Sequence, residues 1–151
     1  MIKKIVLLNL LILIKFLGFS QIEDFKEKFE LPNEVAETSG LLFLNGKIIT
    51  HNDSGDAPNL YELDSLTGNL LRTINISNAT NLDWEDITED ETYIYIGDFG
   101  NNNGNRTDLK IVRITKADYL NSNSVTADFI TFSYEDQTDF SIRTNQHNFD
   151  A

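Results

Sequence analysis

The spacing of apolar residues from Ser39 onward is the feature that most restricts the fold of this chain. Apolar and polar residues alternate with a period of two, as in strands with one buried face. The runs at 39–44 and 47–53 are joined by Asn45-Gly46, a dipeptide that favours a tight hairpin turn. The pattern predicts an all-β fold of eight short strands, whose other six lie at 59–64, 70–77, 84–89, 93–99, 109–114 and 127–134.

The eight predicted strands fall into two similar sets of four. HNDSG and IGDFG both close a second strand, which puts Asp53 and Asp98 45 residues apart (98 − 53). Glu37 and Glu85, near the two first strands, are 48 apart (85 − 37). A four-stranded unit that recurs roughly every 40–50 residues is typical of a β-propeller blade, and a β-sandwich is the alternative. We predict a partial β-propeller of about two to three four-stranded antiparallel blades.

The first 20 residues have the three parts of a secretory signal peptide. Lys3 and Lys4 precede an apolar segment at 5–14, and small residues then lead to a cleavage point after Ser20. A membrane anchor is the alternative, but the apolar run falls short of the ~20 residues of a membrane span. We therefore predict a secreted protein, extracellular or periplasmic, with no stable membrane insertion after cleavage and with one domain at 21–151.

Cleavage would leave a strongly acidic chain. The sequence has 12 Lys and Arg against 24 Asp and Glu, and three of the lysines lie before residue 21, so the net charge becomes −15 (9 − 24). Nucleic acids and anionic lipids bind clustered basic residues, so neither is expected as a partner. The chain has no cysteine, which excludes disulfides and a thiol-linked lipid anchor. The segment at 21–31 is predicted to form either a short helix or an outer strand.

Acidic and amide residues collect at predicted strand ends in both sets. Equivalent strand ends of successive blades lie on one face of a propeller, so these side chains would become neighbours. Calcium prefers oxygen ligands from carboxylates, amides and carbonyls. We predict a calcium site held by several loops, although turn-forming Asp and Asn are the alternative explanation. The candidate ligands are Glu37, Asp53, Glu85, Asp86, Asp98 and Asn101, with Asn52, Asp83 and Asn102 beside them.

A few residues are candidates for contact with an organic ligand. Asn52 and Asp53 offer hydrogen bonds, Trp84 offers a surface for a sugar ring, and Arg106 can pair with phosphate. Core packing of Trp84 and an ion pair between Arg106 and a carboxylate are the alternatives. His51 and Asp53 form a weak catalytic candidate, because a carboxylate can orient an imidazole. The alternative for His51 is a hydrogen bond that stabilises a turn.

The motifs ETSG, HNDSG, DWED and GDFGNN resemble those of secreted bacterial β-propellers of the TolB-like, phytase-like (SdiA-regulated-like) superfamily, of the kind found in Bacteroidetes. The resemblance covers about residues 34–151. It implies Asp- and Asn-rich loops gathered at one mouth of a propeller. Relatives carry more blades and often a C-terminal sorting domain. Because the end of this chain looks like the opening of a third unit, we expect an N-terminal fragment with an open sheet edge.

Three functions follow from these observations. The first is a secreted, non-catalytic binding or scaffold module, stabilised by calcium, whose ligand is a small molecule, a glycan or a protein. The second is a calcium-dependent, phosphoesterase-like hydrolase whose carboxylates hold the metal that activates water. The third is a fragment that completes its sheet with a partner chain. We prefer the first, because only Arg106 and His51 lie near the predicted site to hold a phosphate.

Overall fold

The computed structural model describes residues 26–142 and 147, so the predicted signal peptide lies outside the described residues. The described part of the 21–31 segment forms neither the helix nor the strand that were predicted as alternatives. It is held instead by side chains: Lys28 Nζ donates to the Ser65 carbonyl at 2.6 Å, and the Phe29 ring lies against Gly68. Contacts with the β3–β4 turn therefore replace regular structure there.

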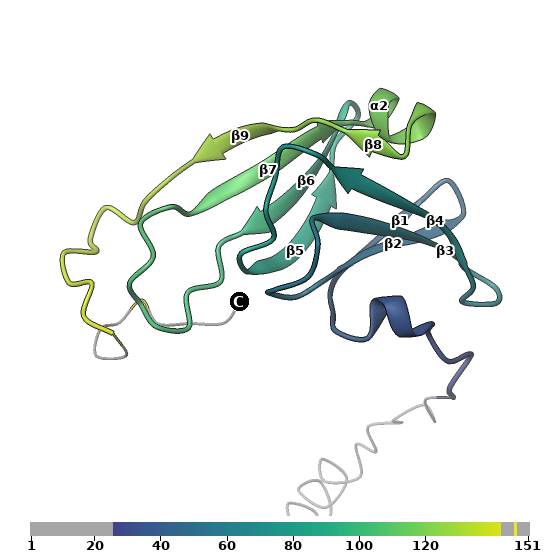
Figure 1. Cartoon of the computed structure of the whole chain (residues 1–151), viewed down its shortest axis with the longest axis horizontal. Coiled ribbons are helices and arrows are strands. Elements are labelled where there is room, and N and C mark those ends of the chain that lie inside the picture. The colour runs from purple at the N-terminus through teal and green to yellow at the C-terminus, as the bar shows by residue number, and fades with distance from the viewer. Residues whose placement is uncertain (1–25, 143–146, 148–151) are drawn as a thin grey trace, which may run out of the picture.

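Two antiparallel-rich sheets make up the fold, which confirms the prediction of an all-β chain (Figure 1). The first sheet has the order β1-β2-β3-β4-β8 and the second β5-β6-β7-β9. A 3₁₀ turn η1 (Asn33–Val35) precedes the first sheet. The strands are β1 (Thr38–Leu44), β2 (Lys47–Asn52), β3 (Asn59–Asp64), β4 (Leu70–Ile76), β5 (Trp84–Glu89), β6 (Tyr93–Asp98), β7 (Lys110–Thr115), β8 (Ser124–Val125) and β9 (Asp128–Thr131).

A helix and a strand between β7 and β9 were missing from the prediction, as was the short η1. Helix α2 (Lys116–Asn121) begins where the Thr115 hydroxyl accepts a hydrogen bond from the Asp118 backbone at 2.9 Å. Strand β8 is only two residues long and pairs in parallel with the end of β4. Neither is long enough to show a hydrophobic period in the sequence. Together they carry the chain from the second sheet back to the first before β9. Among the described residues, no helix is long and apolar enough to span a membrane.

The tight turn between β1 and β2 has the predicted conformation. Asn45 has a φ of 51° and Gly46 a φ of 78°. Two successive positive φ angles are those of a type I′ turn, whose twist matches that of the flanking strands. The hairpin prediction from the Asn-Gly dipeptide is therefore confirmed.

The first two strands of each sheet pair in the same pattern. In the first sheet, a bulge between Thr38 and Gly40 interrupts the pairing of β1 with β2. In the second sheet, a bulge between Trp84 and Asp86 interrupts the pairing of β5 with β6 at the equivalent place, 46 residues later (84 − 38). A bulge re-aims the following side chains, so matching bulges mark a structural repeat.

This register corrects the spacing read from the motifs. Asn52 pairs with Thr38 as Asp98 pairs with Trp84, so Asp98 corresponds to Asn52 and not to Asp53. By the same offset of 46, Glu85 corresponds to Ser39 and not to Glu37 (85 − 46). The sequence motifs were therefore aligned one to two residues away from the structural equivalence, because the acidic residues that were matched do not occupy equivalent positions in the strand pairing.

The hydrophobic core lies between the facing sides of the two sheets. β1 and β5 lie next to one another, and α2 and β8 lie at the opposite end (Figure 1). Ile49 from the first sheet and Ile94 and Ile96 from the second are fully buried there. Tyr119 of α2 also enters this core and donates its hydroxyl to Glu62. Burial and that carboxylate raise the pKa of Tyr119, which keeps its phenol protonated.

Candidate functional site

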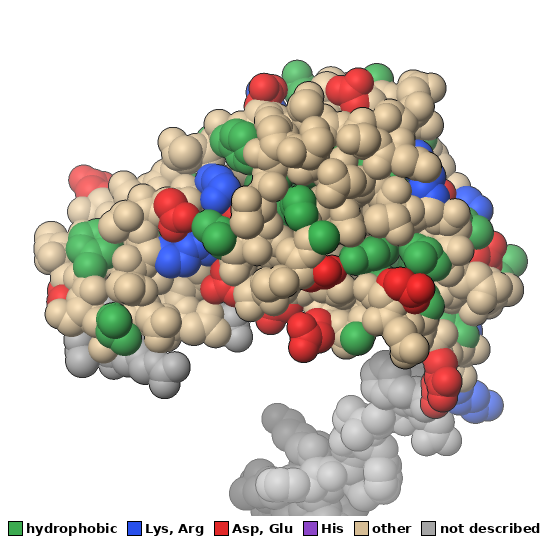
Figure 2. Space-filling view, viewed as in Figure 1, with side chains coloured by type: hydrophobic (Ala, Val, Ile, Leu, Met, Phe, Trp, Pro, Cys, Tyr) green, Lys and Arg blue, Asp and Glu red, His purple; other side chains and the backbone are tan. Residues whose placement is uncertain are grey.

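Three carboxylates meet at one edge of the paired sheets. One oxygen from each of Asp53, Asp83 and Glu85 lies within 4.8 Å of the others. Asp53 directly follows β2, Asp83 directly precedes β5, and Glu85 is the bulged residue of β5. The end of β2 and the start of β5 share this edge, where β1 and β2 contact β5. Figure 2 shows acidic side chains gathered along the lower middle of the viewed face.

The backbone around the three carboxylates is tied by hydrogen bonds from several segments. The Asp53 N–H donates to the Glu37 carbonyl at 2.8 Å. The buried Asn81 amide donates to the Asp53 carbonyl at 2.7 Å and to the Asn52 carbonyl at 3.0 Å. Its Oδ1 accepts from the Trp84 N–H at 3.2 Å. Asn81 therefore joins the end of β2 to the start of β5, a role that its position three residues before Trp84 did not reveal.

Gly100 gives the carboxylates the space that they occupy. A Cβ atom at this position would stand 2.1 Å from Glu85 Oε1 and 2.5 Å from Asp83 Oδ2. The Gly100 N–H also donates to the Asp83 carbonyl at 3.2 Å. Any larger residue would push the two carboxylates out of this arrangement, so a glycine is required by close approach.

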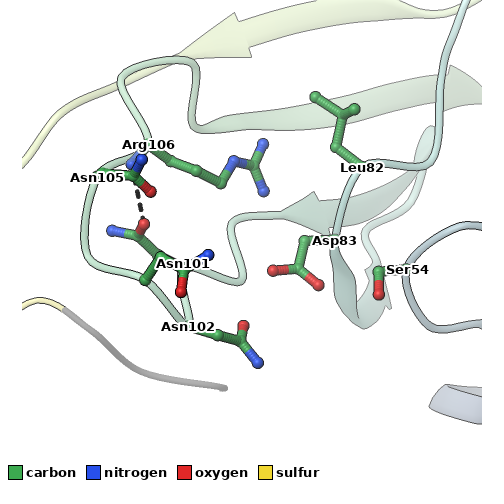
Figure 3. Close-up of a pocket in the computed structure, with 8 residues that line it drawn as sticks. Ser54, Leu82, Asp83, Asn101, Asn102, Asn105 and Arg106 are labelled. Atoms are coloured by element: carbon green, nitrogen blue, oxygen red, sulfur yellow. Dashed lines mark hydrogen bonds between the residues drawn. The ribbon is translucent and has the colours of Figure 1, made fainter. Parts of the chain in front are cut away.

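A polar pocket of about 200 Å³ opens beside Asp83 (Figure 3). Ser54 and Asp83 lie on one side of it, and Asn101, Asn102 and Arg106 lie on the other. Leu82, Asn103 and Asn105 complete the lining. The volume is below the range of about 300–1,000 Å³ that is usual for drug-sized ligands, so the pocket suits a small polar group.

The predicted metal ligands are only partly brought together. Asp53 and Glu85 lie in the cluster, where Asp83 joins them. The exposed Asp86 accepts a hydrogen bond from the Ile87 N–H at 2.8 Å. Asn101 is buried and braces its own loop, since its Oδ1 accepts from the Arg106 N–H at 3.0 Å and its Nδ2 donates to the His147 carbonyl at 3.0 Å. The Glu37 side chain is exposed, and its backbone carbonyl accepts the hydrogen bond from the Asp53 N–H.

Asp98 has a different role from that of an ion ligand at the cluster. Its side chain is fully buried between two cations, with Oδ1 2.8 Å from Arg106 Nη2 and Oδ2 2.8 Å from Lys110 Nζ. Burial alone would lower the pKa of Arg106, but Asp108 and Asp98 raise it and keep the guanidinium charged. The ion pair that we kept as the alternative for Arg106 is thus present.

The remaining predicted contact residues support the loops or the core. Asn52 Nδ2 donates to the Glu34 carbonyl at 2.9 Å and to Asp56 Oδ2 at 2.7 Å. Partial burial opposes the low pKa of Asp56, but hydrogen bonds from Tyr61 and Asn52 outweigh it. Trp84 is fully buried, so its ring packs in the core and presents no surface to a sugar.

His51 is enclosed by the core. It has no exposed surface, its Nδ1 lies 3.0 Å from the Asn52 carbonyl, and its ring meets Trp84 edge-on at 5.6 Å between centroids. Burial lowers the pKa of His51 below its usual value. Hydrogen bonds with the backbone of Asn52 and Asp86 and the negative charges of Asp86 and Asp53 act in the opposite direction, but burial outweighs them. A neutral buried imidazole is suited to packing, which favours the structural alternative for this residue.

This burial predicts a pH dependence of stability between about pH 7 and pH 5. Because the folded pKa of His51 is lower than the unfolded pKa, the unfolded chain binds more protons as the pH falls below the unfolded value. The unfolding free energy should therefore be unaffected by His51 above about pH 6.5. Below that pH it should fall by up to about 1.4 kcal/mol per pH unit. Urea denaturation at a series of pH values measures this slope.

The two histidines provide the matched comparison for this prediction. His51→Gln removes the titrating group, so the slope between pH 7 and pH 5 should flatten even if the variant is less stable. His147→Gln, outside the sheets, is the matched substitution at the other histidine, against which the change in slope of His51→Gln is compared. An unchanged slope in His51→Gln would assign the pH dependence to other groups.

Comparisons of the chain with protein-family models, with curated proteins and with solved structures each gave no match.

Proposed function

We propose that this chain is a secreted, non-catalytic binding module built from two β-propeller blades, and that Asp53, Asp83 and Glu85 bind calcium. The observation that carries the proposal is the convergence of these three carboxylates, whose ligand oxygens lie within 4.8 Å of one another. Calcium takes six to eight oxygens at about 2.3–2.6 Å. The three carboxylates supply part of this set, and the remaining oxygens would come from water and the surrounding loops.

The repeated register supports the propeller part of the proposal. Each sheet begins with a strand at the inter-sheet edge and continues as an antiparallel meander of four strands. The same bulge occurs in both, at an offset of 46 residues (84 − 38). A radial repeat of such units is the architecture of a propeller.

A binding role fits the site better than hydrolysis. His51 has no exposed surface from which to serve as a general base. The Arg106 guanidinium already donates to Asp98, Asp108 and the Gly100 carbonyl, at 2.8, 3.0 and 2.9 Å. The pocket beside Asp83 is instead lined with amides and a hydroxyl, which suit hydrogen bonding to a small polar ligand or one sugar residue.

Calcium should bind the purified chain and stabilise it. Extracellular calcium sites typically have dissociation constants of about 10⁻⁴–10⁻³ M. Calcium at about 100 times the dissociation constant would raise the unfolding free energy by about 2.7 kcal/mol. Isothermal titration calorimetry and thermal unfolding with added calcium measure the two effects. Magnesium should do less, because it demands near-octahedral geometry and gives up its water reluctantly.

Substitutions distinguish calcium binding at this cluster from a nonspecific attraction of calcium to an acidic chain. Asp83→Asn and Glu85→Gln should each weaken calcium binding by at least about tenfold, or ~1.4 kcal/mol, because each removes a charged ligand. Gly100→Ala should do the same by displacing both carboxylates. The matched control is Glu91→Gln in the exposed β5–β6 turn, which removes one acidic charge far from the cluster. Equal binding by all four variants, or no heat and no stabilisation in the unmodified chain, would overturn the proposal.

A further inference from the structure

Each sheet has a second face, which points away from the core. In β1, Leu42 and Leu44 pack against the core, so the alternate residues Leu41 and Phe43 face outward. These two side chains are 67% and 61% exposed. Beside them lies a groove of about 410 Å³, lined mainly by the outward side of β1 and β2, with Leu63 and the N-terminal segment at its border. We refer to this surface of the first sheet as face A.

Face A corresponds, residue by residue, to a surface that is buried within the same chain. The offset of 46 places Leu41 at the position of Ile87, Ile48 at that of Ile94 and Thr50 at that of Ile96. In the second sheet, those three isoleucines pack against the first sheet in the core. Val35 of η1 already packs on the part of face A that carries Ile48 and Leu63. The part left open is formed by Leu41 and Phe43, and it is the kind of surface that receives a neighbouring sheet.

We call the outward surface of the second sheet face B. It corresponds to the surface of the first sheet that packs against the second sheet within the chain. By the same offset, Thr88, Tyr95 and Gly97 occupy the positions of Leu42, Ile49 and His51, which face the second sheet within the chain. A shallow hollow of about 80 Å³ lies on face B between β5, β6 and β7. Within one chain, the surfaces of these two types already pack against each other. Face A and face B are thus two halves of the same kind of interface.

The charged pair on face B also has a counterpart, which is partly buried. Arg113 on β7 pairs with Asp128 on β9 at 3.0 Å. At the equivalent place in the first sheet, Glu62 on β3 pairs with Arg72 on β4 at 2.9 Å, under Tyr119 of the core. The existing interface therefore accommodates an ion pair at this position, with the two charges exchanged.

We propose that face A of one copy binds face B of a second copy, so that this chain assembles head to tail. Such a contact joins two different surfaces, and it closes into a ring when the rotation between copies permits. Propellers close with about four to eight blades, so a ring would contain about two to four copies of this two-sheet unit. The centre of face A is uncharged, which lets it approach another copy although the whole chain has a net charge of −12. Added salt should strengthen the assembly by screening the remaining repulsion.

Sedimentation velocity and light scattering of the purified chain test this assembly. We expect a mass of two to four copies that depends on concentration and rises with salt. Leu41→Glu blocks face A, and Thr88→Arg blocks face B; both residues are exposed in the single chain, so both variants should fold. Each variant alone should sediment as a monomer. Leu120→Glu, at an exposed leucine of α2 outside both faces, should assemble like the unmodified chain.

Mixing the two blocked variants distinguishes a head-to-tail contact from any other. Leu41→Glu retains face B and Thr88→Arg retains face A, so an equimolar mixture should form a 1:1 heterodimer and no larger species. Assembly that Leu41→Glu abolishes but Thr88→Arg leaves intact would mean that two A faces meet instead, and would overturn the proposal. A monomeric unmodified chain at about 1 mM would overturn it as well. Calcium binding can be measured separately on each variant, because neither residue belongs to the carboxylate cluster.

Discussion

Asp98→Ala should lower the unfolding free energy by about 3–5 kcal/mol. The Asp98 carboxylate is fully buried and lies 2.8 Å from both the Arg106 guanidinium and the Lys110 ammonium. Only 15% and 16% of these two cationic side chains is exposed, so removing the anion leaves two largely desolvated positive charges together. The loss should appear in urea denaturation as a lower midpoint with an unchanged slope.

Asp108 supplies the matched control for this effect. It also pairs with Arg106, at 3.0 Å, but its side chain is 52% exposed. Water already solvates such a group, so Asp108→Ala should cost no more than about 1 kcal/mol. Similar losses for the two variants would mean that the burial of Asp98 does not set the energy of this network.

Trp84→Ala should also destabilise the chain strongly, by about 3–5 kcal/mol. Trp84 is fully buried at the first position of β5, where it contacts the His51 ring and belongs to the core between the two sheets. Truncation removes the largest side chain of this core and leaves a cavity that the paired strands are unable to close. Denaturation followed by circular dichroism measures the change, since the variant lacks the only tryptophan.

Leu82→Ala is the comparison for Trp84, because Leu82 lies two residues earlier and is 45% exposed. It should lose less than about 1 kcal/mol. Trp84→Phe should lose less than Trp84→Ala, because it keeps part of the buried ring. A loss below about 1 kcal/mol in Trp84→Ala would contradict the central place of this residue in the core.

The strands and their turns could be predicted from the sequence because they depend on near neighbours. Alternation along the chain decides which side chains share a face of a strand. The Asn45-Gly46 dipeptide decides the first hairpin, because both residues adopt positive φ angles at little cost. The recurrence of four strands was visible for the same reason. The exact offset of 46 was not visible, because it is defined by the pairing of the strands, and the acidic residues that recur do not lie at equivalent paired positions.

Only the tertiary structure decided which groups each acidic residue contacts. Asp53, Asp83 and Glu85 converge because the end of β2 and the start of β5 share one edge of the packed sheets. Asp98, from the same type of motif, lies instead between Arg106 and Lys110.

The sequence by itself determined an all-β chain of repeated meanders with carboxylates at its strand ends. The structure decided which carboxylates meet each other and which meet a cation. It also placed Trp84 and His51 in the core and so removed them from the surface of the site. The physical reason is that hydrogen-bonded turns and alternating faces are local properties of the backbone. Burial and charge pairing depend instead on segments far apart in the chain, which only the packed fold brings together.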